Sequence, residues 1–292
     1  MNPLASIPSP SSGQITLGPL ALHAYGVMLL LGILAAVWLT HRRWVAWGGR
    51  GDLVYSMAMV GVAAGIVGAR LYHVVTSWSE VPNPKWEGAF EIWKGGLGVW
   101  GGVAFGVLAG AWVVRRAGAN VYLMMDAVAP GILLAQGIGR IGNYFNQELF
   151  GKPTSLPWGL EINRDNRPVG YEQYSTFHPT FLYELCWDTV GVLLLIWIGR
   201  RFRIRPPGIF CLYVAYYTFG RFFEELLRID PAHHFAGLRL NAWVSIVVFV
   251  LAVAGFVWSQ RRGEEKPSGP AVRAAPRGPR MAIPKGRVRP GR

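Results

Sequence analysis

The sequence is dominated by long apolar stretches, most of them close to the length that a helix needs to cross a lipid bilayer. A hydrocarbon core about 30 Å thick requires roughly 20 mostly apolar residues in one helix. Charged residues make up only 15% of the chain, well below the roughly 25% of soluble domains. We therefore expect an all-α integral membrane protein with about seven transmembrane helices rather than a soluble enzyme. The seven stretches are residues 19–40, 53–73, 97–114, 121–138, 180–198, 208–227 and 241–259.

Lysine and arginine are concentrated after every second apolar stretch. Nineteen of the 29 basic residues follow the first, third, fifth and seventh stretches. Because basic loops stay on the cytoplasmic side of a membrane, this pattern predicts an N-terminus outside and a C-terminus in the cytoplasm. No positively charged segment precedes the first apolar stretch, so we expect that stretch to be kept as an anchor.

Polar segments surround the predicted membrane domain. Residues 1–18 are expected to form an external N-terminal segment, and residues 19–262 a seven-helix transmembrane domain. A polar insert at residues 152–177 is expected to form a small external head between helices four and five. Residues 263–292 are rich in Pro, Gly, Ala and Arg and are expected to be a disordered, basic cytoplasmic tail. No nucleic-acid motif accompanies the net charge of +13, so membrane lipid, and no nucleic acid, is the expected anionic partner.

Ionisable side chains are costly within a membrane, so each one needs a partner or a function. Four groups of polar residues lie in or beside the apolar stretches, and all fall at the predicted outer end of the helices. A single shared site is the economical explanation. In chain order the groups are His23 with Tyr25; Arg140, Asn143, Asn146 and Glu148; His178, Tyr183 and Glu184; and Tyr217, Arg221, Glu224, Glu225 and Arg228.

The arginines in these groups indicate the chemistry of the site. Arg221, Glu225 and Arg228 lie at i, i+4 and i+7 and share one helix face. Taken alone, this spacing is the mark of an internal salt bridge. Convergence of the four groups favours a ligand site instead, because Arg140 and Arg221 offer planar, permanently charged forks that suit a phosphate. The residues thus predict a membrane protein that handles an anionic lipid headgroup.

Residues 139–151, GRIGNYFNQELFG, closely resemble the signature G-R-x-G-N-F-x-N-x-E-x-x-G of the bacterial prolipoprotein diacylglyceryl transferases. Supporting matches are HAYG at 23–26, HPTFLYE at 178–184, and R-F-x-x-E-x-x-R at 221–228. The resemblance covers about residues 14 to 262, with the motifs in the same order. Four ordered motifs are far more specific than one glycine-rich run.

The resemblance implies a transferase that moves the diacylglyceryl group of phosphatidylglycerol onto a lipobox cysteine thiol in the signal peptides of preprolipoproteins. A thioether forms and glycerol phosphate leaves. The implied location is the bacterial cytoplasmic (inner) membrane, with the active site toward the outer leaflet. No cofactor or metal is implied, and the sequence holds neither a Walker-type loop nor a zinc-ligand spacing. A lipid flippase or transporter is the alternative, although such proteins are often built from repeats and none is evident here.

The resemblance also implies roles for individual residues. The positions carried over as catalytic are Arg140, Arg221, Glu148 and Tyr25, with His23 added as a candidate base. The positions expected to bind phosphatidylglycerol are Arg140, Asn143, Asn146, Gly151, Tyr217, Arg221 and Glu225.

One departure concerns the proton acceptor. Many members of the family have a histidine before the double glycine of the third helix, whereas this chain has Trp100. An indole cannot accept a proton from a thiol. Either the histidine is dispensable, or His23 or Glu148 replaces it, or the arginines alone stabilise the thiolate. For His23, which falls on an otherwise apolar predicted helix, a hydrogen-bonded packing role is slightly favoured over the role of a base.

Overall fold

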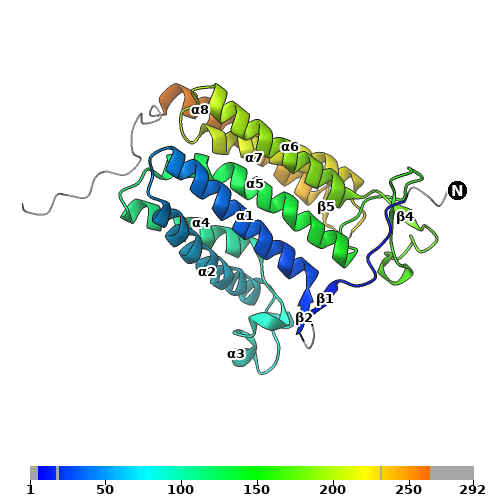
Figure 1. Ribbon diagram of the computed structural model, residues 1–292. Coiled ribbons are helices and arrows are strands. Elements are labelled where there is room, and N and C mark those ends of the chain that lie inside the picture. The colour runs from blue at the N-terminus through cyan, green and yellow to red at the C-terminus, as the bar shows by residue number, and fades with distance from the viewer. Residues whose placement is uncertain (1–5, 18–19, 231, 264–292) are drawn as a thin grey trace, which may run out of the picture.

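The computed structural model describes residues 6–17, 20–230 and 232–263, and within them seven long helices lie alongside one another in a bundle (Figure 1). We call the end where α5 and α7 finish the head end, and the opposite end the far end. The long helices are α1 (Ala24–Ala46), α2 (Gly51–Thr76), α4 (Val99–Arg116), α5 (Val121–Asn146), α6 (Thr180–Arg201), α7 (Gly208–Leu227) and α8 (Leu240–Arg262).

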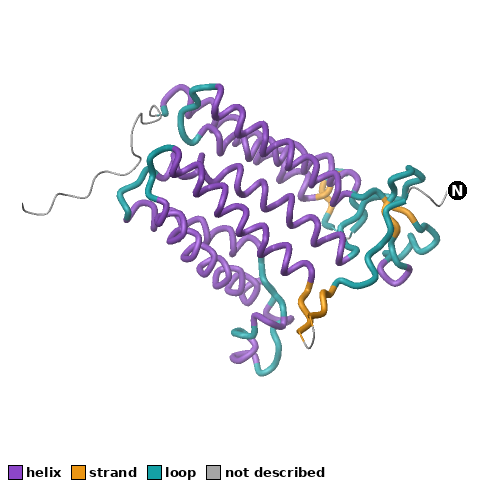
Figure 2. The backbone as a smooth tube through the Cα atoms, viewed as in Figure 1, coloured by secondary structure: helices purple, strands orange, loops and turns teal. Residues whose placement is uncertain are grey.

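Short elements cluster around the head end, as Figure 2 shows. Three antiparallel pairs of strands form there, each made of neighbours in the sequence. The pairs are β1 (Gln14–Leu17) with β2 (Leu20–His23), β3 (Leu160–Glu161) with β4 (Thr176–Phe177), and β5 (His234–Phe235) with β6 (Leu238–Arg239). The short helices are α3 (Lys85–Gly88) and the 3-10 turns η1 (Trp78–Glu80), η2 (Ile92–Lys94) and η3 (Arg164–Asn166).

Five of the long helices, α1, α2, α5, α6 and α8, are long and apolar enough to cross a membrane. This is consistent with an integral membrane protein and confirms the predicted helical class. α4 and α7 are not among these five; α4 ends in Arg115 and Arg116, and α7 contains Arg221, Glu224 and Glu225.

The helices pack in pairs that set the positions of the polar residues. α1 lies along α5, α2 along α4, and α7 along α8, while α5 also contacts α6 and α7. Gly32 of α1 allows a close approach, because an added Cβ there would lie 3.1 Å from the carbonyl oxygen of Ala135 in α5. Small residues at such crossings are typical of helices packed in membranes. α5 is therefore the central helix, in contact with the helices that carry the other polar groups.

The predicted boundaries agree with most helix ends but differ by more than four residues at three of them, the start and end of α1 and the end of α5. α7 spans the predicted 208–227, whereas α5 continues eight residues beyond the predicted end at 138 and ends at Asn146, followed by Gln147 with a φ of 51°. The first eight residues of the motif at 139–151, Arg140 among them, therefore lie on a helix and not between two helices. Residues 20–23 form β2, not the start of α1, because a short apolar run has no helical period to separate helix from strand. Most of the predicted tail, residues 264–292, lies outside the described residues.

Candidate functional site

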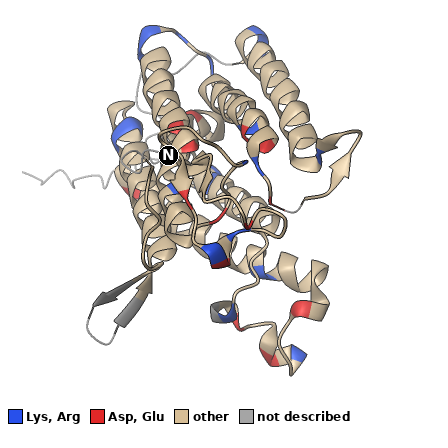
Figure 3. Cartoon of the chain, turned by 90° about the vertical axis from the view of Figure 1, so that its right-hand side faces the viewer, with Lys and Arg blue, Asp and Glu red and all other residues tan. Residues whose placement is uncertain are grey.

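Two arginines from different helices share one carboxylate at the head end. Glu184, in the first turns of α6, is 5% exposed. Its Oε2 pairs with Nε of Arg140 on α5, and its Oε1 lies 2.9 Å from Nη1 of Arg221 on α7. Figure 3, which looks at this end, shows acidic and basic segments side by side on neighbouring helices. The predicted convergence of the second, third and fourth polar groups is thus observed as direct contact.

A second carboxylate lies behind Arg221 and is the most deeply buried charge of the site. Glu225 is 1% exposed, and its Oε1 pairs with Nη2 of Arg221 and lies 3.7 Å from Nη1 of Arg228. The predicted shared face of Arg221, Glu225 and Arg228 is therefore correct. Arg239, at the end of β6, faces Oε2 of Glu225 at 2.7 Å as an ion pair without the alignment of a hydrogen bond.

Two further acids complete the cluster. Glu224 lies 3.4 Å from Arg221, and Asp230 binds Arg228 at 2.7 Å and Arg239 at 2.8 Å. Burial alone would raise the pKa of Asp230, but hydrogen bonds and charge from the two arginines outweigh it and hold that pKa below its ordinary value. We call the set of four arginines and four acids the paired cluster. Its members are Arg140, Arg221, Arg228, Arg239, Glu184, Glu224, Glu225 and Asp230.

The end of α5 adds an amide and carboxylate branch to the paired cluster. Asn143 and Asn146 donate to the same oxygen, Oε1 of Glu148, at 2.9 and 3.0 Å. Arg140 reaches Oδ1 of Asn143 at 3.5 Å, so the branch is connected to the arginines. Glu148 is exposed, and no hydrogen bond to its Oε2 is found within the described residues. That oxygen is open to a substrate.

Gly151 is the point at which the loop after α5 touches α6 and α7. Its backbone N–H donates to the carbonyl of His178 at 2.9 Å, and it bridges to Arg228. A Cβ at this position would lie 2.8 Å from Cβ of His178 and 3.3 Å from the carbonyl oxygen of Leu227. Only glycine permits this approach without a shift of the backbone, so its position supports the geometry of the cluster.

The two predicted tyrosines approach α5 from different sides. The ring of Tyr25 lies against Gly142, where an added Cβ would be 2.6 Å from Cδ2 of the tyrosine. Tyr217, one turn before Arg221, lies near enough to Arg140 to interact with its charge. The first polar group thus reaches the helix that carries Arg140.

The candidate proton acceptors lie at different distances from the cluster. His23 is the last residue of β2 and is exposed, so the expected packing role within a helix is wrong. Trp100 is 62% exposed at the start of α4, and within the described residues it makes no polar contact with the cluster. His178 lies next to Gly151, with Nδ1 at 3.1 Å from the hydroxyl of Tyr183. Burial and then the charge of Lys152 lower the pKa of His178, which favours a neutral imidazole.

The paired cluster leaves little room between its side chains. The hollow lined by Arg140, Asn143, Glu184, Arg221 and their neighbours has no measurable room for a water-sized sphere. Pockets for small molecules, by comparison, are commonly about 300–1,000 Å³. The carboxylates therefore occupy the positions closest to the guanidinium groups, and an incoming anion has to displace them.

Sequence reasoning missed the role of one member of the paired cluster, Glu184, and the presence of two others, Arg239 and Asp230. Glu184 belongs to a predicted polar group but received no role, although it holds both phosphate-binding candidates. A signal was present, since a carboxylate within a helix of this kind needs a cationic partner. Arg239 was not predicted at all, because a single arginine just before an apolar stretch looks like an ordinary membrane flank.

Comparison with known proteins identifies the family. The sequence model described as prolipoprotein diacylglyceryl transferase matches residues 13–258. The chain belongs to this family. The resemblance based on the four motifs is confirmed, and the match contains every member of the paired cluster.

Relatives in the prolipoprotein diacylglyceryl transferase family are similar along most of the chain. A protein of Cutibacterium acnes named phosphatidylglycerol–prolipoprotein diacylglyceryl transferase is 51% identical over 271 residues, which is 91% of this chain and 92% of the relative. A second protein, named phosphatidylglycerol–prolipoprotein diacylglyceryl transferase 2, from Streptomyces coelicolor is 51% identical over 262 residues, covering 89% and 82% of the two chains. A relative from Bifidobacterium adolescentis, named as the first, is 44% identical over 276 residues, with the same coverage of 89% and 82%.

Proposed function

We propose that this chain transfers the diacylglyceryl group of phosphatidylglycerol to the lipobox cysteine thiol of preprolipoprotein signal peptides. Family membership supports this, as do the names of the relatives, which state both substrates. The observation that carries the proposal in this chain is the pair of arginines bridged by Glu184 at the head end. Two converging guanidinium groups form a site for the phosphate that links the diacylglyceryl group of the lipid to its headgroup glycerol.

In this proposal the lipid phosphate takes the place of Glu184 between Arg140 and Arg221. A phosphate diester and a carboxylate both present two oxygens to a guanidinium fork, so the exchange keeps each arginine paired. When the bond to glycerol breaks, negative charge grows on the departing phosphate. Guanidinium groups already in position stabilise this charge with little reorganisation. Glu225 and Arg239 hold Arg221 from behind during the exchange.

The chemical step replaces one bond to a glycerol carbon with another. The thiolate sulfur attacks the carbon that carries the phosphate, a carbon–sulfur bond forms, and the carbon–oxygen bond breaks. The electron pair leaves with glycerol phosphate. The thiol proton passes to Oε2 of Glu148, which Asn143 and Asn146 orient through the other oxygen. The positive charge of Arg140 favours the thiolate. Tyr25 and Tyr217 position the headgroup.

We further propose that all seven long helices span the bacterial cytoplasmic membrane, with the head end facing the outer leaflet. The distribution of basic residues supports this orientation, because Arg42, Arg43, Arg115, Arg116 and Arg200 all lie at the far end of their helices. Single cysteines at Lys152 and at Arg116 in a chain lacking Cys186 and Cys211 test it. An impermeant thiol reagent added outside should label the first and spare the second, and the opposite labelling contradicts the orientation.

The transfer reaction is tested by incubating the purified chain with labelled phosphatidylglycerol and a lipobox peptide. The expected product is a peptide carrying a diacylglyceryl thioether, together with glycerol phosphate. A peptide in which serine replaces the lipobox cysteine is the matched control and should give no product. Labelled lipid that crosses a liposome bilayer while no thioether forms would instead support a flippase.

A further inference from the structure

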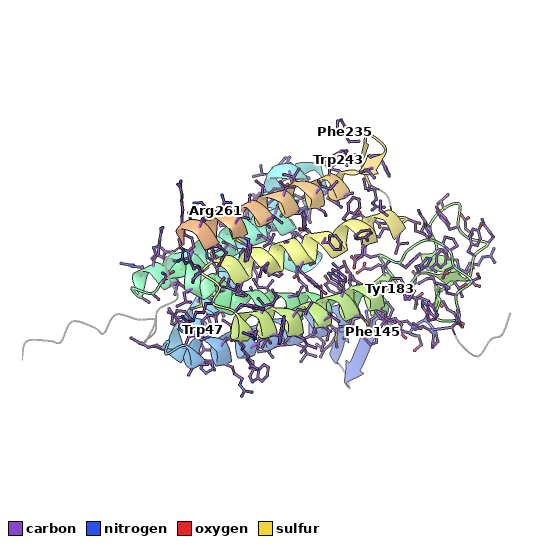
Figure 4. All side chains as sticks on the ribbon, turned by 90° about the horizontal axis from the view of Figure 1, so that it is seen from above. Trp47, Phe145, Tyr183, Phe235, Trp243 and Arg261 are labelled. Atoms are coloured by element: carbon purple, nitrogen blue, oxygen red, sulfur yellow. The ribbon has the colours of Figure 1, made fainter. Side chains whose placement is uncertain are left out.

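A second basic site lies at the far end of the bundle, between the last turns of α1 and α6. A cavity of about 370 Å³ opens there, and we call it the far pocket. This volume falls within the usual range of ligand pockets. Figure 4 shows Trp47, which lines the pocket, at the end of the molecule opposite Tyr183. The residues that define the pocket are Trp38, Arg42, Arg43, Trp47, Ile196 and Arg200.

The arginines of the far pocket lack the acidic partners of the paired cluster. Within the described residues, none of Arg42, Arg43 and Arg200 forms an ion pair with a carboxylate. The acid whose charge reaches Arg43 is Asp126, but Oδ1 of that residue accepts from the backbone N–H of Phe210 at 3.0 Å. Three guanidinium groups therefore face one cavity with an excess of positive charge.

Two of these arginines are held in place by uncharged contacts. Arg43 donates to the backbone carbonyls of Asp126 at 3.1 Å and Ala127 at 3.2 Å, and its guanidinium lies 4.9 Å from the ring centre of Trp47. Arg42 lies 5.3 Å from the ring centre of Trp38. Stacking on an aromatic ring restricts a guanidinium while leaving its edge free to donate hydrogen bonds. The far pocket is therefore ordered before any anion arrives.

The composition of the pocket indicates an amphiphilic ligand. Guanidinium groups recognise phosphate oxygens, whereas the indole faces and the side chains of Leu39 and Ile196 are suited to a glycerol backbone and the first carbons of acyl chains. Tryptophan and arginine also concentrate at the level of lipid headgroups. We propose that the far pocket binds the phosphate headgroup of an anionic phospholipid in the leaflet opposite the transfer site. The proposal assumes that the bundle spans a bilayer but does not depend on the transfer reaction.

A bound lipid would join three helices. It would link α1 to α6 through Arg42 and Arg200, next to the contact that Arg43 makes with α5. Tyr25 lies in the first turn of α1 at the head end, about 25 Å from Arg42 along the helix. The lipid therefore fixes the helix whose other end lies against Gly142. A ligand of this kind stabilises the folded chain in proportion to its occupancy.

The test uses the full chain purified in a neutral detergent and three proteins: the unaltered chain, Arg42→Gln/Arg200→Gln, and Arg115→Gln/Arg116→Gln. The control pair removes the same charge at the same end, and Arg116 likewise stacks 5.0 Å from the ring centre of Trp112, but neither control arginine lines the pocket. Binding of dioleoyl phosphatidic acid is measured by native mass spectrometry and by thermal unfolding. Lipid bound at the head end is common to all three proteins, so differences report on the far pocket.

The proposal predicts that native mass spectra of Arg42→Gln/Arg200→Gln show one fewer bound lipid than those of the unaltered chain. Titration with the lipid should show at least about tenfold weaker binding at the far pocket, while the control pair behaves like the unaltered chain. Arg42→Lys/Arg200→Lys, which keeps the charge, should recover part of the binding and excludes loss of folding as the cause. Equal loss in both glutamine pairs, equal retention of dioleoyl phosphatidylcholine, or equal binding of inorganic phosphate would overturn the proposal. The thioether assay is separate, so its failure leaves this test intact.

Discussion

The arginine side chains at the two ends of the bundle have opposite surroundings. At the head end, the four arginines of the paired cluster are matched by four acids, and Glu225 is almost wholly buried between them. At the far end, Arg42, Arg43 and Arg200 face a cavity and are held by indoles and backbone carbonyls. A paired arginine releases a carboxylate when it binds an anion, whereas an unpaired one does not. This difference suits exchange of a substrate at the head end and stable retention of a lipid at the far end.

The largest expected difference between the two ends is in catalysis. Arg221→Ala should lower the rate of thioether formation by about 10²–10³, because loss of one preorganised donor to the developing charge typically has that effect. Arg116→Ala, at the far end, should leave the rate within about twofold of the unaltered chain, because a substitution acts strongly only where it removes transition-state contacts. Initial rates at saturating lipid and peptide measure both. Comparable losses in the two variants would remove Arg221 from the phosphate site.

The buried carboxylates at the head end should contribute strongly to the stability of the folded chain. Glu225→Gln leaves the arginines around it without a buried counter-charge, which is expected to lower the free energy of unfolding by about 3–5 kcal/mol. Thermal unfolding in detergent measures the loss. Glu224→Gln is the matched control, since among the described residues that acid makes a single ion pair, at 3.4 Å, and should lose less. Equal losses would show that Glu225 is not the centre of the cluster.

A histidine at position 100 tests whether the cluster needs a base supplied by α4. Trp100→His should change the rate far less than the roughly 10²–10⁴-fold that a positioned general base contributes, because Trp100 makes no polar contact with the described part of the cluster. Glu148→Gln, by contrast, should slow transfer substantially. A large gain in rate from the histidine, most visible in a pH–rate profile, would assign proton abstraction to α4 and not to Glu148.

The smallest expected effect is the dependence of stability on pH that His178 causes at the head end. The pKa of His178 is lowered in the folded chain, so between its folded and unfolded values the unfolded chain binds more protons. Stability should therefore rise with pH through this window and fall as the pH drops below about 6.5, the ordinary value. His178→Gln should flatten this part of the curve of thermal midpoint against pH. An unchanged slope in that variant would exclude His178 as its source.

Hydropathy and charge predicted the seven long helices and the polar groups at one end, because apolar length and helical spacing are local properties of the chain. The extension of α5 to Asn146 was missed, since Arg140 and Asn143 end an apolar stretch without ending a helix. The bridging role of Glu184 and the contribution of Arg239 depend on which helices are neighbours. That information comes from packing around α5 and is not contained in any single motif.

The most direct test of the arginine pair is the affinity for phosphatidylglycerol in the absence of peptide, compared between the unaltered chain and Glu184→Gln. The glutamine keeps the shape of the side chain but no longer competes with phosphate for Arg140 and Arg221. Binding should tighten by about tenfold, equivalent to about 1.4 kcal/mol, while Glu224→Gln changes it much less. Weaker or unchanged binding in a folded Glu184→Gln chain would contradict the claim that the phosphate replaces Glu184.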